Sequence, residues 1–307
     1  MKFELTILGC GGAIPTLERN PTSQYLNIQD RHFLIDCGEG FQIQLRKYKC
    51  KFSKIDHIFI SHLHGDHFLG LFGYLSTLSL LGRNTPINIY APKDLLNLIN
   101  AHNEISGKKY NFDLNFNALN FKESTKIYED KILEIFSFPV NHSVPCCGFL
   151  FQEKKSQRNV IKAKIKDLGL GIGDIKKLKN RENCVVDGRS IKYKEVTVSG
   201  SKARSYAYCA DTKYDEKIIP FIKDVDVLYH ESTFLEELKN KASKTKHSTP
   251  NQAAKIALNA NSKMLILGHF SARYDNVEKF VQEASSIFKN TVAAYDGYKY
   301  QIQNLSN

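Results

Sequence analysis

The run Ser61-His62-Leu63-His64-Gly65-Asp66-His67 places four potential metal ligands within six residues. Residues 55–60 before it form a short apolar stretch typical of a buried strand, and the apolar run 68–81 after it has helical spacing. In an extended chain His62 and His64 point to the same side, and the two ligands after the glycine turn are placed to serve a second metal ion. Imidazole and carboxylate together suit zinc or another first-row divalent ion. The run therefore predicts a metal site at the end of a strand.

Strand-like and helical patterns continue on both sides of this run. Thr249-Pro250, with Thr as the cap and Pro in the first turn, predicts a helix ending near Asn259, and Pro92 opens another. Because strands occur both in consecutive pairs and in alternation with helices, we predict a mixed sheet layered between helices, in one α/β domain of residues 1–307. The expected strands are residues 3–8, 25–28, 32–35, 55–60, 87–90, 133–140, 149–152, 205–210, 225–229 and 264–267.

Composition places the chain among ordinary globular proteins. With 307 residues, 42% hydrophobic and 24% charged, it is neither a disordered nor a fibrous protein. The longest uncharged apolar run, 68–81, is shorter than the roughly 20 residues that a membrane span needs, and the first residues show no signal-peptide pattern. The seven cysteines form no C-x-x-C pair, and we interpret the adjacent Cys146 and Cys147 as core residues rather than a soft metal site. We expect a soluble cytoplasmic protein without a membrane partner.

Positive charge is concentrated in one segment. Residues 153–202 hold 14 Lys and Arg against 6 Asp and Glu, which is most of the net charge of +11. Such a field favours a polyanionic partner, although a solvated surface loop is the simpler alternative. Glycines at 169, 171 and 173 separate short apolar patches, so we predict a small flexible arm inserted into the domain.

The metal run belongs to a longer pattern. Asp36 precedes the run, and His142, Asp211 and His269 follow it in that order. The run and these four residues together resemble the signature of the metallo-β-lactamase superfamily. The resemblance implies an αββα four-layer sandwich and a role for Asp36 in orienting the ligand loop. It also implies two ligand sets that share one aspartate: His62, His64, His142 and Asp211 for one metal ion, and Asp66, His67, Asp211 and His269 for the other.

Further motifs are similar to those of the ribonuclease Z family, the tRNA 3′-processing endonucleases. They are Pro15-Thr16-Leu17-Glu18-Arg19-Asn20, with Leu17 where that family has Lys; His230-Glu231-Ser232-Thr233-Phe234; Lys246-His247-Ser248-Thr249; and residues 269–274. The basic segment 153–202 occupies the position of that family's tRNA-binding arm, although its glycine-rich tip lacks proline. The resemblance covers residues 3–274.

This resemblance implies a zinc-dependent endoribonuclease that removes the 3′ trailer from precursor tRNA, leaving a 3′-OH on the tRNA and a 5′-phosphate on the trailer. Two Zn²⁺ ions per subunit would hold a bridging hydroxide that attacks the phosphorus. Asp66 would accept a proton, His247 would protonate the departing oxygen, and Glu231 would orient His247. The family implies a homodimer in which the arm of one subunit grips the tRNA cut by the other.

The sequence is compatible with two other functions. The same ligands would serve a hydrolase of small phosphodiesters or lactones, which would not need the basic arm, and a non-catalytic RNA-binding relative would be expected to have lost ligands. Glu231 is alternatively a surface ion pair, and Arg273 contacts either a phosphate or a structural partner. Histidines that match no motif are expected to be ordinary packing or surface residues; they are His32, His57 and His102.

Overall fold

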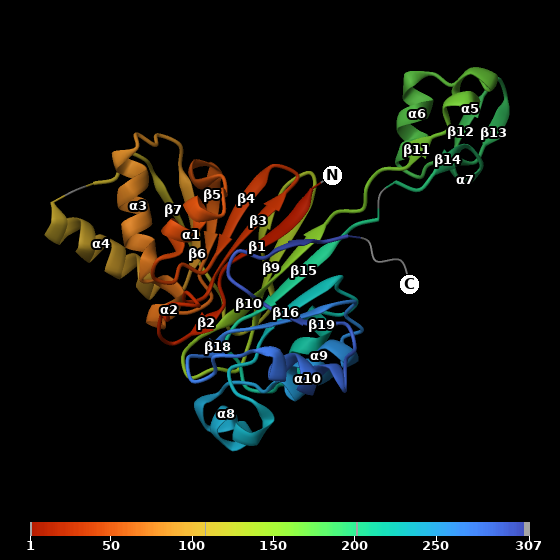
Figure 1. Ribbon diagram of the computed structural model, residues 1–307. Helices are drawn as coiled ribbons and strands as arrows, with labels where there is room; N and C mark the ends of the chain where they lie inside the picture. The colour runs from red at the N-terminus through yellow and green to blue at the C-terminus, as the bar shows by residue number, and fades with distance from the viewer. Residues whose placement is uncertain (1, 108, 201, 304–307) are drawn as a thin grey trace.

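The computed structural model describes residues 2–107, 109–200 and 202–303, and two seven-stranded sheets form its centre (Figure 1). The first sheet has the order β20 (Lys299–Gln301), β1 (Phe3–Gly9), β3 (Ser23–Ile28), β4 (Arg31–Ile35), β5 (Ile55–Phe59), β6 (Ile87–Ala91) and β7 (Leu114–Ala118). The second has the order β19 (Thr291–Ala293), β17 (Leu265–Gly268), β16 (Val227–Glu231), β15 (Ser205–Cys209), β10 (Cys147–Glu153), β9 (Leu133–Pro139) and β8 (Thr125–Glu129).

Both sheets are mixed. Strands β4, β5, β6 and β7 run parallel, and so do β15, β16, β17 and β19. Because β10 is antiparallel to both β9 and β15, β9 runs in the same direction as β15. The carboxyl ends of β9, β15, β16 and β17 therefore share one edge of the second sheet. The mixed character was predicted, but the residue patterns alone indicated one sheet where the structure has two.

Alternation along the strands produces a core between the sheets and a second one beneath the helices. In β4, Phe33 faces the other sheet while Leu34 faces the helices, as the two-residue period of a strand requires. Aromatic rings join the sheets: the centroids of Phe33 and Phe151 lie 5.6 Å apart, and those of Phe59 and Phe149 lie 5.4 Å apart. These fully buried rings fix the face-to-face packing.

Helices cover the outer face of each sheet and complete four layers. Figure 1 shows α1, α3 and α4 beside the first sheet and α9 and α10 beside the second. The Thr249-Pro250 helix start is confirmed, because Thr249 caps α9 through the amide of Gln252 and Pro250 is its first residue. The helices of the body are α1 (Phe41–Lys47), α2 (Gly65–Phe68), α3 (Gly70–Leu80), α4 (Asp94–Ser106), α8 (Lys239–Thr245), α9 (Pro250–Asn259) and α10 (Glu278–Ser285), with 3₁₀ turns η1 (Phe52–Lys54), η2 (Glu216–Phe221) and η3 (Glu236–Leu238). This order confirms the αββα sandwich.

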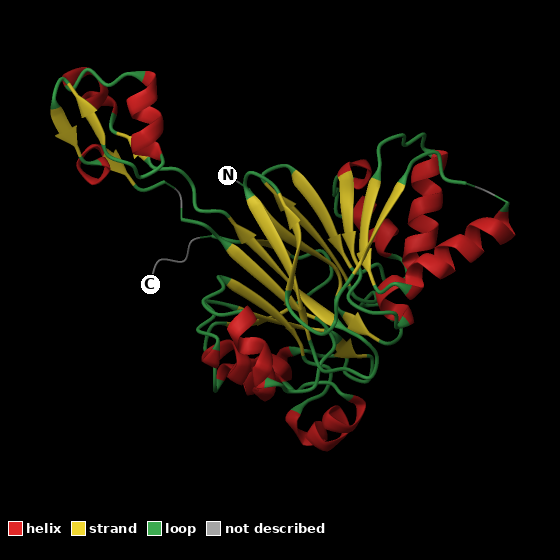
Figure 2. Cartoon of the chain, turned by 180° about the vertical axis from the view of Figure 1, so that it is seen from behind, coloured by secondary structure: helices red, strands yellow, loops and turns green. Residues whose placement is uncertain are grey.

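Between β10 and β15 the chain leaves the sheets and forms a small unit that stands apart from them (Figures 1 and 2). It contains the pairs β11 (Asn159–Val160) with β14 (Thr197–Val198) and β12 (Cys184–Val186) with β13 (Arg189–Ile191), and the helices α5 (Lys162–Asp167), α6 (Ile172–Lys179) and α7 (Tyr193–Val196). Its own buried cluster consists of Leu170, Leu178, Cys184, Ile191 and Val196. The salt bridge between Glu153 and Arg204, 2.7 Å long, joins the two segments that lead to it.

A short pair of strands, β2 (Gly11–Gly12) and β18 (Phe270–Ser271), closes the end of the sandwich where the histidines gather. Within the described residues, every helix is too short or too polar to cross a membrane.

Candidate metal centre

The predicted ligands gather where strands end. His62 and His64 follow β5, Asp211 follows β15, and His269 follows β17, so the sheets deliver them to a common edge. His142 follows β9, and the remaining pair, Asp66 and His67, lies on α2. Loops at the carboxyl ends of parallel strands are where α/β folds place their sites.

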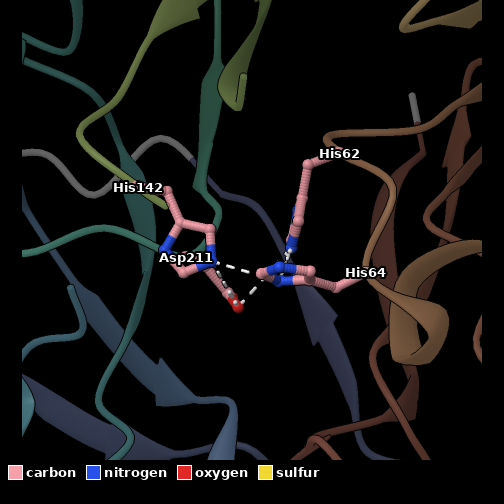
Figure 3. A group of neighbouring side chains, drawn as sticks. All are labelled: His62, His64, His142 and Asp211. Carbon is pink, nitrogen blue, oxygen red and sulfur yellow. Dashed lines mark hydrogen bonds and ion pairs between the residues drawn. The ribbon is translucent and has the colours of Figure 1, made fainter. Parts of the chain in front are cut away.

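The first group joins three imidazoles to one carboxylate (Figure 3). Nε2 of His62 lies 3.0 Å from Nδ1 of His64, and Nε2 of His142 lies 3.1 Å from the same nitrogen. Oδ2 of Asp211 lies 3.7 Å from Nε2 of His62 and 3.8 Å from Nε2 of His142. Four ligand atoms thus surround one small space.

The second group lies on the other side of Asp211. Nε2 of His67 lies 3.3 Å from Nε2 of His269, and Oδ2 of Asp66 lies 3.5 Å from the first and 3.3 Å from the second. Oδ1 of Asp211 lies 3.5 Å from Nε2 of His67 and 3.2 Å from Nε2 of His269. Asp211 therefore offers one oxygen to each group. This is the arrangement that two ligand sets sharing one aspartate need.

The spacing fits metal ions. Nitrogen and oxygen ligands about 2.0–2.1 Å from a tetrahedral ion lie roughly 3.3–3.4 Å from one another. The ligand distances in the two groups, from 3.0 to 3.8 Å, bracket that value. Asp211 is only 2% exposed, and among the described residues its Oδ1 makes no hydrogen bond. A buried carboxylate oxygen that accepts no hydrogen bond and faces only two imidazoles is costly, and a bound cation would satisfy it.

The imidazole of His67 is fixed through its other nitrogen. Nδ1 of His67 lies 2.8 Å from Oδ2 of Asp36, and the two Asp36 oxygens also accept bonds from the Ser61 amide and hydroxyl, at 2.8 and 2.9 Å. The Tyr208 hydroxyl donates to Asp36 at 2.6 Å. Asp36 thus joins the ligand loop to β15, and such outer partners set the tautomer and direction of metal-binding histidines.

His269 is held by a close backbone approach. Its φ of 58° lies in the left-handed region that residues with a Cβ rarely adopt. A Cβ at Gly12 would lie 2.6 Å from the His269 ring, so only glycine fits in the facing strand β2. Nδ1 of His269 lies 2.9 Å from the hydroxyl oxygen of Thr233. Gly12 is thus needed to seat this imidazole.

Electrostatics keep the two carboxylates ionised. Burial opposes their charge, but His269 and His67 outweigh it and hold the pKa of Asp211 well below its ordinary value. For Asp66, burial is again outweighed, by His67 and His269, and its pKa is lowered. The amide of Ala13 donates to Oδ2 of Asp66 at 2.7 Å, which further stabilises the charged form. Both groups are therefore available as anionic ligands.

Burial lowers the pKa of His62, His64 and His142, with neighbouring histidines adding to the effect in each. These imidazoles are neutral at neutral pH and can offer a lone pair. His67 differs: burial is outweighed by Asp211 and the other carboxylates around it, which raise its pKa well above the ordinary value. A cation bound there would have to displace a proton, so metal binding should weaken in acid.

His247 and Glu231 form a pair beside the two groups. Nδ1 of His247 lies 2.9 Å from Oε1 of Glu231, and the His247 ring lies 5.2 Å from that of His142 and 5.4 Å from that of His269. Burial opposes protonation of His247, but Glu231 outweighs it and raises the pKa of His247 to about 9. The His247 side chain is 16% exposed, so substrate can reach it. Glu231 is fully buried, so the pair does not lie on the surface.

Sequence reasoning overlooked Thr233 and Lys246. The Thr233 hydroxyl contacts Oε2 of Glu231 at 2.8 Å and Nδ1 of His269 at 2.9 Å, and so links the pair of His247 and Glu231 to the second ligand group. The Lys246 ammonium donates to the carbonyl of His142, and the Lys246 carbonyl lies 3.0 Å from Nδ1 of the same histidine. Thr233 belongs to the motif at 230–234 and Lys246 to the motif at 246–249, so motif membership could have identified both residues.

The loop around residues 15–20 is held by the C-terminal part of the chain. The buried Arg19 donates to the carbonyls of Tyr274 and Asp275, the latter at 3.4 Å. Asp296 accepts from the amide and side chain of Asn20, at 2.8 and 2.9 Å. Leu17 is fully exposed at the tip. Arg19 and Asn20 therefore shape this loop, while Asp296 carries no local sequence signal.

Arg273 is exposed, its Nε donates to the Ser271 hydroxyl at 3.1 Å, and its guanidinium lies 5.2 Å from the centroid of the Phe234 ring. Within the described residues it forms no ion pair. The three remaining histidines that matched no motif lie outside both ligand groups and pack against aromatic rings: His32, His57 and His102. Cys146 and Cys147 are free, buried members of the core between the sheets, as predicted.

Known proteins are similar to this chain along its full length. The chain is 42% identical over its full length to ribonuclease Z of Bacteroides thetaiotaomicron, of which it covers 97%. Ribonuclease Z of Cytophaga hutchinsonii is also 42% identical, with 99% of this chain and 97% of that relative covered. A family model described as Anti-Pycsar protein Apyc1 matches residues 3–161.

Solved structures agree. Human tRNase Z, short form, superposes with a TM-score of 0.71 at 26% identity, covering 98% of this chain and 99% of that one. The metallo-β-lactamase fold protein YhfI of Bacillus subtilis, 18% identical, covers 98% of this chain and 100% of its own with a TM-score of 0.70, which shows the shared fold. The chain belongs to the ribonuclease Z family, and its residues 3–161 belong as well to the family described as Anti-Pycsar protein Apyc1.

Proposed function

We propose that this protein is a metal-dependent endoribonuclease that removes the 3′ trailer from precursor tRNA, leaving a 3′-OH on the tRNA and a 5′-phosphate on the trailer. The observation that carries the proposal is the pair of ligand groups sharing Asp211, with the hydrogen-bonded His247 and Glu231 beside them. Full-length similarity to proteins named ribonuclease Z supports tRNA processing rather than another chemistry of the same fold.

The residues suit two Zn²⁺ ions per subunit. His62, His64, His142 and Asp211 would hold one, and Asp66, His67, Asp211 and His269 the other. Two such ions supply Lewis acidity at the phosphoryl oxygens and a nucleophile at neutral pH. The ionised carboxylates and the neutral imidazoles of His62, His64 and His142 support a divalent cation.

The chain's own residues would move the protons. Oδ2 of Asp66 is occupied by the Ala13 amide, and among the described residues Oδ1 makes no hydrogen bond, so the proton taken from the attacking water would go to Oδ1. Glu231 holds Nδ1 of His247, which leaves Nε2 to donate a proton to the departing 3′ oxygen. Glu231 acts through His247 as a positioning residue, anchored by the amides of Thr212, Thr233 and Ser248.

Residues 153–202 would form the flexible arm that grips tRNA, supported by 14 basic against 6 acidic residues and by the unit's separation from the sheets in Figure 1. We further infer a cytoplasmic homodimer in which one subunit's arm serves the other subunit's metal centre. Sedimentation or mass photometry would test the dimer, and mixing an arm-deleted subunit with a His247→Ala subunit would test the exchange, since only heterodimers would then regain one complete site.

The deciding experiment is cleavage of a 3′-extended precursor tRNA by metal-loaded protein, with both new ends mapped. We expect one cut at the 3′ side of the tRNA body, lost on chelation and much reduced in His247→Ala. Protein that holds metal and hydrolyses bis-p-nitrophenyl phosphate but leaves precursor tRNA intact would instead be a small-molecule phosphodiesterase of the same superfamily.

A further inference from the structure

A large cleft lies at the end of the second sheet opposite the metal centre. Its volume is about 1300 Å³, and we call it the amino-end cleft because its walls immediately precede the parallel strands β15, β16, β17 and β19. Arg204 and Asp211 flank β15 at its two ends, and an extended stretch of that length spans roughly 23 Å. Most of the lining comes from residues 155–158, 199–200, 202–205, 223–226, 261–263 and 288–290.

Its lining is cationic. Eight lining residues are Lys or Arg and two are Asp, drawn from both the basic segment and the body. Sites for small molecules are mostly apolar and roughly 300–1,000 Å³ in volume, so this cleft differs from them in both chemistry and size. It is suited to an extended polyanion.

Two of the cations crowd one another. The ammonium of Lys263 pairs with Asp226, a buried carboxylate that also accepts from the amide and hydroxyl of Ser205, at 2.8 and 3.2 Å. Lys202 lies within hydrogen-bonding reach of Lys263, whose ammonium lowers the pKa of Lys202. Asp226 therefore lies beside both ammonium groups, and an anion placed between the two lysines would relieve their mutual repulsion.

Further cations project into the same space without an anionic partner. Lys223 and Lys289 come from the body, and Lys155 and Arg181 come from the basic segment. All four are exposed, and within the part of the chain that the structure describes none of them forms an ion pair. Exposed lysines held in one concave surface bind phosphates with release of counterions.

We propose that the amino-end cleft binds the phosphodiester backbone of the RNA substrate at a distance from the bond that is cut. The proposal rests on the proposed function, which supplies a tRNA as the polyanion. Because the strands of the second sheet separate this cleft from the metal centre, its phosphates belong to the tRNA body rather than to the nucleotides beside the cut. The body lysines thus add to the arm a second, fixed surface for the same RNA.

The test is the double variant Lys223→Glu/Lys289→Glu in otherwise intact, metal-loaded protein. We expect KM for precursor tRNA to rise about tenfold or more with kcat unchanged, and the dependence of log KM on log salt to become shallower by about 1–2. Mature tRNA without a trailer should lose inhibitory strength by a similar factor, because the cleft contacts the tRNA body. Hydrolysis of bis-p-nitrophenyl phosphate should not change.

The matched control is Lys51→Glu/Lys54→Glu, which makes the same charge change at two exposed lysines that precede β5, on the side of the first sheet away from the metal centre. Equal KM values and salt slopes in the two double variants would overturn the proposal. Wild-type protein that leaves precursor tRNA uncut would overturn the proposed function instead. If the glutamate variant loses bis-p-nitrophenyl phosphate hydrolysis, the neutral Lys223→Gln/Lys289→Gln pair replaces it, with a smaller shift of the same sign expected.

Discussion

The metal centre and the basic segment are built by opposite means. At the metal centre nearly every polar atom is directed by a named partner, as Asp36 shows with bonds to Ser61, His67 and Tyr208. The segment between β10 and β15 has a small cluster of five buried residues and a surface of lysines. Catalysis needs ligands held to within fractions of an ångström, whereas attraction of a polyanion depends on charge density and tolerates loose geometry.

Because of this difference, variants of the two regions should lose activity on different substrates. A change in one of the metal ligands should affect every phosphodiester alike, because all substrates meet the same ions. A change in the basic segment should affect only substrates large enough to reach it. Comparing precursor tRNA with bis-p-nitrophenyl phosphate therefore tells the two regions apart.

The largest effect is expected for Asp211→Ala, since this carboxylate gives one oxygen to each ligand group. We expect loss of bound metal and a fall of at least about 10³-fold in kcat on both substrates. The prediction is checked by measuring metal content with plasma mass spectrometry and kcat on precursor tRNA and on bis-p-nitrophenyl phosphate. For metal content and for hydrolysis of bis-p-nitrophenyl phosphate, Asp226→Asn is the matched control, because Asp226 is equally buried, at 2%, but lies in the amino-end cleft at the other end of the sheet. Full metal content in Asp211→Ala would contradict the shared-ligand interpretation.

His247→Ala is expected to reduce kcat on precursor tRNA by about 10²–10⁴-fold, the range for loss of a general acid. The effect on bis-p-nitrophenyl phosphate should be much smaller, because p-nitrophenolate departs without a proton. The ratio of the two losses measures the acid role, and metal content should stay at the wild-type value. Equal losses on both substrates would assign His247 to metal or phosphate binding instead.

Local sequence predicted the residues that gather at the candidate metal centre, because most of them stand in short motifs. Four ligands stand within six residues, and the strand ends that carry the others were recognisable from apolar stretches ending in His or Asp. The cap at Thr249 was equally visible. The pairing of Glu231 with His247 joins positions 16 residues apart and could be proposed only through the family resemblance.

Other parts carried little signal. The edge strand β7 reads Leu-Asn-Phe-Asn-Ala and is partly exposed, and β20 has only three residues, so neither shows a buried-strand pattern. Strands β8 and β19 and helix α10 were missed as well. Asp296, which holds Asn20 from 276 residues away, depends on β20 returning beside β1, and no local pattern predicts such contacts.

Removal of the basic segment should act on one substrate only. The cut is best made between Lys154 and Arg204 with a short Gly-Ser linker, because Glu153 and Arg204 are already joined by a salt bridge where β10 and β15 pair. We expect kcat/KM for precursor tRNA to fall by about 10²-fold and hydrolysis of bis-p-nitrophenyl phosphate to stay near wild type. Comparable losses on both substrates would show that the segment supports the fold of the metal centre.

The smallest effect is expected for Glu231→Gln and is sharpest in the pH profile. His247 donates a proton only while it is protonated, so its contribution is complete below its pKa and disappears as pH rises through that value. Because Glu231 raises the pKa of His247 to about 9, removing the carboxylate charge should move the alkaline limb of kcat to lower pH by about one unit or more. Rates on precursor tRNA between pH 6 and about pH 10 measure the shift. Gln leaves the Thr233 amide and hydroxyl partly unpaired, so some loss of rate at every pH is expected too. If kcat falls equally at every pH and the alkaline limb does not move, Glu231 only supports the structure around it and does not set the pKa of His247.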